Sequence, residues 1–365
     1  MVRPTISIGR NVEGRNVINT AHGHPGLIDV HTHAIDPALP DLSTTYPQDR
    51  WPRVDQISET DATLVFGGSA YRKIDHRCWS PRARIADMDR DGVALQVLSP
   101  IPVTFCYEAS AAGAAELAAS QNDFFARLVT DHPLRFAALG GVALQDPDRA
   151  IDELRRCVRQ LGFLGVEIAT QVNGTELADP CLDEFFAVAH ELDALILVHP
   201  SDQDLTPRLP GLRLSFGAGM PLETTIAAAG LVGSGALTRR PYVRLCLAHG
   251  AGALPAVIGR LDKGAMMAGL DPGSADRPRT VARQLWCDSI TYDRLALDAA
   301  IALFGEDHVV FGSDYPFPAM PKPLDDVVAQ LPIELFRKIS RTNLENHHGA
   351  LPRSGPHPLP VAGRH

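Results

Sequence analysis

The stretch LIDVHTH, residues 27–33, is an apolar run that ends in two histidines separated by one residue. A nearly continuous apolar run is typical of a parallel strand that is buried on both faces. Residues i and i+2 of a strand point to the same side, so His31 and His33 can face one point together. Since imidazoles are common ligands of metal ions in enzymes, this stretch predicts a metal site at the end of a buried strand.

Seven further runs of the same kind follow, and helix-like patterns separate them. The predicted strands are Leu27–His33, Ala94–Pro100, Phe136–Ala143, Gly165–Thr170, Ala194–Pro200, Val243–Gly250, Gln284–Ile290 and Val309–Pro316. The predicted helices include Arg82–Asp91, Asn122–Val129, Pro147–Leu161 and Leu222–Leu237. Eight strands that alternate with helices favour an α/β fold, a (β/α)8 TIM-like barrel. An open, doubly wound sheet is the alternative, but no G-x-G-x-x-G follows any of these runs.

The barrel domain is predicted to span residues 25–350. Residues 36–80 are too long for a simple connection and are rich in Pro, Asp, Thr, Gly and aromatic residues. We interpret them as an insertion over the active-site mouth, between the first strand and the first helix, because long loops in compact domains are usually functional. Residues 1–24 are interpreted as a flexible N-terminal arm, and residues 351–365, with four prolines, as a flexible C-terminal tail.

The composition is that of an ordinary globular protein, with 365 residues, 45% hydrophobic residues and a formal net charge of −9. This acidic balance gives no basic surface for nucleic acid or an anionic membrane. No apolar stretch is long enough to span a membrane, and the N-terminus lacks the apolar core of a signal peptide. The six cysteines form no C-x-x-C pair, which suits a reducing compartment, so we expect a cytoplasmic protein.

Four predicted strands carry metal-type ligands at their ends. In addition to His31 and His33, the fifth strand ends at His199, the sixth at His249 and the eighth at Asp314. Active sites of such barrels lie at the C-terminal ends of the strands. One His-x-His pair alone would be weak evidence, but four of the fourteen histidines lie at this same end. Three imidazoles and one carboxylate suit zinc or a similar divalent ion, with a position left for water.

Longer motifs point to a known family. They are IDVHTH (28–33), YRKIDHRCWSP (71–81), RIADMDRDGV (84–93), LVHP (197–200), GMPLETT (219–225), LAHGAGALPAVIGR (247–260) and VVFGSDYPFP (309–318). With these motifs, residues 27–348 resemble the amidohydrolase superfamily and its decarboxylase branch, and they are most similar to the 2-amino-3-carboxymuconate-6-semialdehyde decarboxylase family. The resemblance implies a metal-dependent, non-oxidative carboxy-lyase that acts on an unsaturated or aromatic carboxylic acid.

The resemblance also implies roles for individual residues. One divalent metal ion, zinc in the first place and manganese as the alternative, would be bound by His31, His33, His199 and Asp314, and Asp314 would also be catalytic. His249 would be the base that holds and deprotonates a water molecule at the metal. Arg72 would bind a carboxylate of the small-molecule substrate, which suits the planar fork of arginine. Arg260 would reach the substrate of a partner subunit across a homodimer interface.

The sequence departs from that family beside the metal ligands. Ser201 stands where close relatives carry Trp, residues 203–219 bear little likeness to them, and Ala251 replaces a glycine of an H-G-G-G motif. We therefore expect a different substrate preference. Two other functions use the same barrel. A hydrolase or hydratase would need the same metal site, and a barrel that has lost activity would serve as a scaffold, although all four predicted ligands are present.

Overall fold

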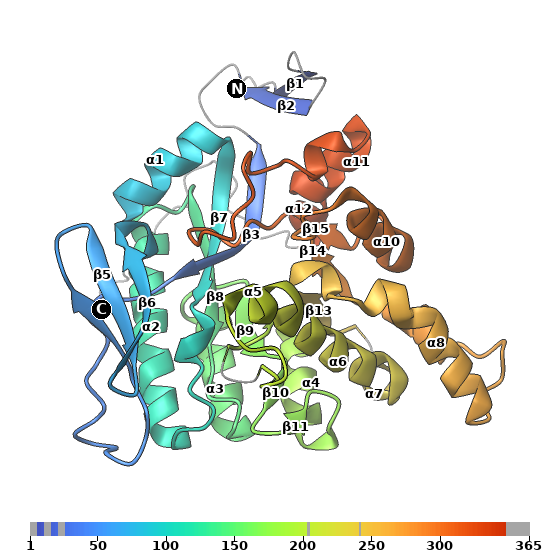
Figure 1. The fold of residues 1–365 in the computed structure, drawn as a ribbon, viewed down its shortest axis with the longest axis horizontal. Coiled ribbons are helices and arrows are strands. Elements are labelled where there is room, and N and C mark those ends of the chain that lie inside the picture. Colours follow the sequence, from blue (N-terminus) through green and yellow to red (C-terminus); the bar gives the residue numbers. More distant parts are fainter. Residues whose placement is uncertain (1–5, 11–15, 21–25, 203–204, 241, 348–365) are drawn as a thin grey trace, which may run out of the picture.

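The computed structural model describes residues 6–10, 16–20, 26–202, 205–240 and 242–347. Eight parallel strands form one sheet in the order β15-β14-β13-β12-β9-β8-β7-β3. The segment after β15 closes this sheet, because Thr32 pairs with Tyr315 and the amide of Val30 donates to the carbonyl oxygen of Phe311 at 2.9 Å. The predicted (β/α)8 barrel is therefore confirmed (Figure 1).

Helices surround the strands (Figure 1). The barrel strands are β3 (Leu27–Ala34), β7 (Val93–Pro100), β8 (Phe136–Gly141), β9 (Gly165–Ala169), β12 (Leu195–His199), β13 (Arg244–Leu247), β14 (Trp286–Asp288) and β15 (Val309–Val310). The helices are α1 (Pro81–Asp91), α2 (Ala111–Asp131), α3 (Pro147–Arg159), α4 (Asp183–Glu191), α5 (Leu212–Leu214), α6 (Met220–Gly233), α7 (Ala236–Arg239), α8 (Leu254–Met267), α9 (Pro278–Ala282), α10 (Arg294–Phe304), α11 (Ile333–Arg337) and α12 (Asn343–His347). A short hairpin, β10 (Gln171–Val172) and β11 (Thr175–Glu176), follows β9.

The predicted helices differ from the observed ones mainly in their ends. The helix predicted from Asn122 belongs to α2, which begins at Ala111; its first turns are rich in Ala and Gly and give little apolar contrast. The helix predicted over residues 222–237 is divided into α6 and α7, because Gly235 has a φ of 76° and interrupts the helical backbone. Arg260 lies within α8, which continues past that residue to Met267.

The insertion over residues 36–80 contains a sheet that the sequence analysis did not predict. Strands β4 (Pro52–Gln56), β5 (Asp61–Phe66) and β6 (Ser69–Asp75) pair antiparallel. Gly67 and Gly68 join β5 to β6 with φ values of 55° and 81°. A Gly-Gly pair between two β-rich runs is a recognised hairpin signal, so this turn could have been predicted. The sheet lies at one side of the barrel (Figure 1, blue) and brings residues 71–73 into the cavity described below.

A register shift in β3 positions its two histidines. The pairing of β3 with β7 shifts between Asp29 and Thr32. Ile28 and Val30 belong to the buried cluster with Leu195, Leu197 and other strand residues that fill the barrel. Without the shift, His31 and His33 would point to the opposite side from Ile28 and Val30, because alternate residues of a strand face opposite ways. With the register shift, the apolar side chains of Ile28 and Val30 and the rings of His31 and His33 lie on the same side of β3.

The two chain ends are described only in part. Within the arm of residues 1–24, β1 (Ile6–Arg10) and β2 (Asn16–Thr20) pair antiparallel. The other residues of that arm and the tail at 351–365 lie outside the described residues, so their predicted flexibility stays a prediction. Among the residues described, none of the helices is long and apolar enough to cross a membrane.

Candidate metal centre and active site

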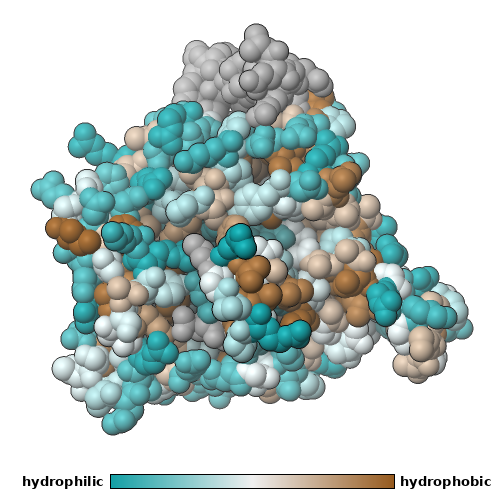
Figure 2. Space-filling model, in the orientation of Figure 1, coloured by the Kyte–Doolittle hydropathy of each residue, from teal (hydrophilic) through white to brown (hydrophobic). Residues whose placement is uncertain are grey.

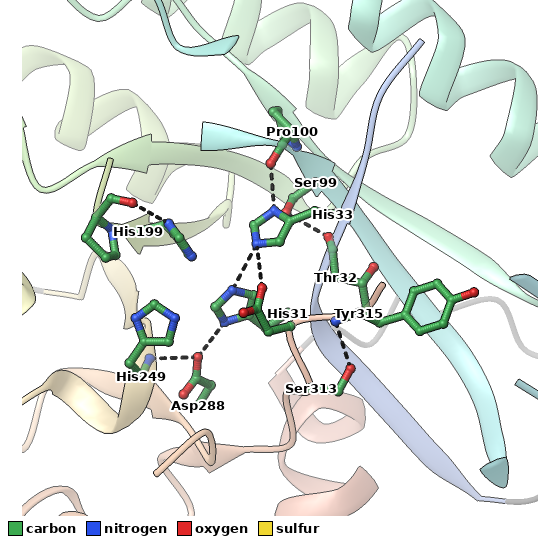
Figure 3. A network of polar contacts seen from close by, with 12 residues as sticks. His31, Thr32, His33, Ser99, Pro100, His199, His249, Asp288, Ser313 and Tyr315 are labelled. Carbon is green, nitrogen blue, oxygen red and sulfur yellow. Dashed lines mark hydrogen bonds and ion pairs between the residues drawn. The ribbon is translucent and has the colours of Figure 1, made fainter. Parts of the chain in front are cut away.

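Three imidazoles meet at the carboxyl end of the barrel. His31 and His33 come from β3, and His199 is the last residue of β12. Their ring centroids lie 4.9 to 5.1 Å apart, and the Nε2 atoms of His31 and His33 are 3.2 Å apart. All three side chains are buried. Figure 3 shows the three rings turned toward one space.

The outer nitrogen of each ring is held by the protein. The Nδ1 atom of His31 lies 2.6 Å from a carboxylate oxygen of Asp288, and the Nδ1 atoms of His33 and His199 lie 2.7 Å from the carbonyl oxygens of Pro100 and Pro200. Since carbonyl and carboxylate oxygens only accept, each Nδ1 carries the proton and each Nε2 keeps a lone pair for the common space. This arrangement is typical of metal-ligating histidines.

Asp314 and His249 border the same space. A carboxylate oxygen of Asp314 lies 3.3 Å from Nε2 of His33. The ring centroid of His249 lies 5.0 Å from that of His199 and 5.3 Å from that of His31. Both residues adopt the left-handed backbone region, with φ values of 57° for His249 and 63° for Asp314. Such conformations are uncommon outside glycine and gather at functional sites.

These side chains fit a divalent metal ion. Possible ligand atoms fall into three groups, within which they lie no more than 4.8 Å apart. The groups are His31, His33 and Asp314; His31, His199 and His249; and His33, Glu167 and His199. The predicted ligands are therefore close together but divided between overlapping groups. Nε2 of His199 is buried without a hydrogen-bond partner in the described structure, and a bound cation would supply the missing partner.

Asp288 is a site residue that the sequence analysis missed. It is the last residue of β14 and is fully buried. Its carboxylate faces His31 and also accepts hydrogen bonds from the backbone amides of His249 and Gly250, each at 2.9 Å. Burial opposes its charged form, but the hydrogen bonds from His31 and the amide of Gly250, together with the electrostatic attraction of His31 and His249, outweigh burial and hold the pKa of Asp288 below its usual value. Asp288 therefore orients His31 and the backbone of His249 together. Its place at the end of a predicted strand, like that of Asp314, was the available signal.

His249 is placed to exchange protons. Burial lowers the pKa of His249 to about 4, so the ring is neutral at neutral pH and keeps a lone pair that can accept a proton during the reaction. Its Nδ1 is buried and has no hydrogen-bond partner among the described residues. The ring lines two cavities, the one described in the next paragraph and a neighbouring one beside Tyr292.

A cavity of about 530 Å³ opens beside the histidines, a size typical of small-molecule sites. His33, His199, His249 and Asp314 line one part of it, and Arg72 and Tyr71 of β6 line another. The guanidinium of Arg72 lies 4.6 Å from the ring centroid of Phe317 and donates to Asp202 at 3.2 Å. Tyr71 also donates to Asp202.

The region where the sequence departs from its relatives also borders this cavity. Arg213 and Phe216 of residues 203–219 line it, and Met220 of the adjoining GMPLETT motif does as well; the sequence analysis assigned no role to these three residues individually. Ser201 is buried and lines a smaller adjacent cavity of about 160 Å³. Although Ser201 stands where close relatives carry Trp, the cavity still has aromatic side chains in its wall, namely Tyr71, Phe216 and Phe317.

Arg260 lies elsewhere. It is exposed on α8 and is not among the residues that line the cavity of its own chain. Figure 1 shows α8 extending outward, away from the β4–β6 sheet. Within its own chain, Arg260 therefore does not reach the proposed substrate cavity.

Known proteins similar to this chain include barrel enzymes with a bound metal ion, in agreement with the barrel and the candidate metal site. The family model for amidohydrolases matches residues 28–343. The chain belongs to the amidohydrolase family. The amidohydrolase is 36% identical to the 2-amino-3-carboxymuconate-6-semialdehyde decarboxylase of Dictyostelium discoideum. The aligned 324 residues cover 87% of this chain and 88% of that protein.

Two further relatives belong to the same branch. The gamma-resorcylate decarboxylase of Rhizobium sp. strain MTP-10005 is 28% identical over 319 residues, covering 79% of this chain and 93% of its own. The crystal structure of a dihydroxybenzoic acid decarboxylase from Polaromonas sp. JS666, with bound manganese and the inhibitor 2-nitroresorcinol, aligns with a TM-score of 0.69 at 21% identity over 88% of this chain and 96% of that one. The structural likeness establishes the fold, and the curated relatives place this amidohydrolase in the decarboxylase branch.

Proposed function

We propose that this amidohydrolase is a metal-dependent, non-oxidative decarboxylase of an unsaturated or aromatic carboxylic acid. The observation that carries the proposal is the convergence of the Nε2 atoms of His31, His33 and His199 with Asp314 beside a cavity that also presents Arg72. Three imidazoles and a carboxylate are a divalent-metal ligand set, and an arginine suits a carboxylate substrate. The decarboxylase relatives support this reaction over others.

Each of these side chains has a separate role in the proposed decarboxylation. A divalent ion held by His31, His33, His199 and Asp314 would supply a Lewis acid toward oxygen atoms of the substrate. Arg72 binds a substrate carboxylate, exchanging its contact with Asp202 for one with the substrate. The carbon–carbon bond to the leaving carboxylate breaks, carbon dioxide departs, and the electron pair stays on the carbon. His249, neutral before the reaction, takes up a proton from solvent water and delivers it to that carbon, where it replaces the departed carboxylate.

Hydrolysis or hydration on the same site is the alternative. It would need the same ligands and His249, so the side chains alone do not separate it from decarboxylation. Carbon dioxide is the product that separates the two, because hydrolysis and hydration release none. The experiment is to incubate the metal-loaded enzyme with a panel of muconate-type, resorcylate-type and other aryl carboxylic acids and to measure substrate loss and carbon dioxide together. Matched stoichiometry with one or more acids supports the proposal; substrate loss without carbon dioxide would contradict it.

Within that panel we predict a preference unlike that of the 2-amino-3-carboxymuconate-6-semialdehyde decarboxylases. The reason is that Ser201 and the region of residues 203–219 differ from those relatives, while Arg213 and Phe216 of that region line the cavity. We expect another acid to give the highest kcat/KM. Turnover of 2-amino-3-carboxymuconate semialdehyde above about 10⁴ M⁻¹s⁻¹, an ordinary enzyme efficiency, would remove the basis for this prediction.

We also propose that the working form is a homodimer in which Arg260 serves the partner's site. Arg260 is exposed and does not line its own cavity, so it can contribute to binding only from another chain. Large apolar side chains are exposed on α5 and on α6, which packs against α8: Leu214, Leu222 and Ile226. Figure 2 shows apolar surface over α5 and α6. Two-fold dimers are the commonest oligomers.

Mixing two inactive variants tests the homodimer. His249→Ala and Arg260→Ala are each expected to be inactive alone. After subunit exchange, half of the dimers are mixed and one of their two sites has both residues intact, so activity should return to about a quarter of wild type. Sedimentation should show dimers that exchange. If mixed dimers form and the mixture stays inactive, Arg260 does not act across the interface.

We also propose which metal ion the site binds and where in the cell the protein is located. With Asp314 as the one carboxylate of the predicted ligand set, three imidazole ligands favour zinc, and manganese is the alternative. A cytoplasmic location is supported by the six cysteines, which are free and of which five are buried.

A further inference from the structure

Glu167 is a buried acid that the sequence analysis passed over. It lies in β9, in the run GVEIA, and its side chain is fully buried. Neither carboxylate oxygen makes a hydrogen bond of normal geometry within the described residues, and the hydroxyl of Ser99, which lies near the carboxylate, donates to the carbonyl oxygen of Thr32. Removing a carboxylate from water without giving it a partner is strongly unfavourable, so a group of this kind in a well-packed barrel indicates a missing partner. A charged residue within an apolar strand was the signal available in the sequence.

The strand pairing directs Glu167 toward the metal ligands. Glu167 pairs with Leu197 of β12, two residues before His199. Leu197 belongs to the cluster that fills the barrel, so Glu167 faces the interior from the neighbouring strand. Its carboxylate lies in one group with ring nitrogens of His33 and His199, no two of these atoms being more than 4.8 Å apart. These are two of the proposed metal ligands.

We propose that Glu167 is an additional ligand of the same divalent ion, on the β9 side of His33 and His199. A cation supplies the partner that both carboxylate oxygens lack. The charges also balance, because two carboxylates, Glu167 and Asp314, neutralise a divalent ion whose other ligands are neutral imidazoles. A second oxygen ligand shifts the set toward ions that prefer oxygen, such as manganese, relative to the nitrogen-dominated set without it. The inference rests on the proposed metal site.

Asp29 provides a matched control. It is also an acid that is fully buried in a barrel strand, close to His31. Its carboxylate is satisfied within the protein, since Ser313 donates to it at 2.5 Å and the backbone amide of His31 donates to it at 3.4 Å. It is absent from all three groups of potential ligands. Asp29→Asn therefore removes a buried charge at a similar depth without removing a proposed ligand.

The test is metal binding without substrate. Metal-free wild type, Glu167→Gln and Asp29→Asn are titrated with Mn²⁺ and, separately, with Zn²⁺ by calorimetry, and the spin-resonance spectrum of bound Mn²⁺ is recorded. We expect Glu167→Gln to weaken Mn²⁺ binding at least about tenfold, since even residues that only support a ligand change affinity about 10–100-fold. Zn²⁺ binding should weaken less, and the Mn²⁺ spectrum should change. Asp29→Asn, which removes no proposed oxygen ligand, should keep the wild-type ratio of Mn²⁺ affinity to Zn²⁺ affinity and the wild-type Mn²⁺ spectrum.

Thermal unfolding supplies a second readout. The metal-free Glu167→Gln protein should melt no lower than metal-free wild type, because the unpaired carboxylate is gone, and saturating Mn²⁺ should raise its melting temperature less than it raises that of wild type. If Glu167→Gln does not fold, Glu167→Asp, whose shorter carboxylate reaches less far, is titrated in its place, with the same expected weakening.

Three results are distinguishable. Mn²⁺ affinity of Glu167→Gln within about twofold of wild type would overturn the inference. A fall from two bound ions per chain to one would also overturn it, because Glu167 would then serve a separate ion. Wild type that binds neither ion would instead contradict the proposed function itself.

Discussion

Replacing His249 with alanine is expected to lower kcat about 10²–10⁴-fold, the usual effect of removing a general base, while the enzyme keeps its metal. The ring of His249 faces the cavity beside the metal ligands, and burial lowers its pKa to about 4. It is therefore free to take up a proton, and the proposed ligand set is complete without it. Elemental analysis and steady-state kinetics of the same preparation provide the measurement.

The control is His190→Ala, because His190 is exposed on α4 and does not line the cavity. It should retain wild-type kcat and metal content. The geometry also allows a competing role, since a ring nitrogen of His249 lies in one group with those of His31 and His199. Metal content that collapses in His249→Ala would show that His249 is a ligand and that its assignment as a base is wrong.

Asp314→Asn is expected to lose the metal and, with it, all turnover above background. Asparagine keeps the size of the side chain and tolerates the left-handed backbone at this position, where φ is 63°. The fold should therefore persist while the anionic ligand facing His33 is lost. Wild type should contain about one equivalent of divalent metal per chain, and the variant should contain far less after dialysis. Circular dichroism checks the fold.

Asp307→Asn serves as the control because Asp307 is an exposed acid paired with Lys338. It should keep both metal and activity. An Asp314→Asn enzyme that holds a full equivalent of metal would remove Asp314 from the ligand set, and two tightly bound ions in wild type would contradict the single-ion model.

The barrel could be predicted because strands buried on both faces leave a strong sequence signal. The runs that contain His31, His199 and Asp314 are apolar up to the ligand, and in a parallel barrel all strand ends meet at one edge. Elements without such contrast were harder to predict. The insertion sheet depends on the turn at Gly67 and Gly68, and the start of α2 lies in a stretch of small residues.

The residues that orient or complete the site could not be assigned from the sequence in the same way. Asp288 is functional because it faces His31 and the backbone of His249, and these contacts exist only in the folded barrel. The pairing of Arg72 with Asp202 joins the insertion to the end of β12, 130 residues apart. The register shift in β3, which brings His31 and His33 onto the side of Ile28 and Val30, has no counterpart in the simple alternation of the sequence.

The most direct test of metal-dependent decarboxylation is carbon dioxide release by metal-stripped enzyme as a divalent ion is added back. The substrate is the best acid of the panel. We expect no carbon dioxide above background from the stripped enzyme. Release should rise in proportion to added Mn²⁺ or Zn²⁺ and reach a plateau near one equivalent per chain. Equal release with and without the metal, or substrate consumption that yields no carbon dioxide at any metal content, would contradict metal-dependent decarboxylation.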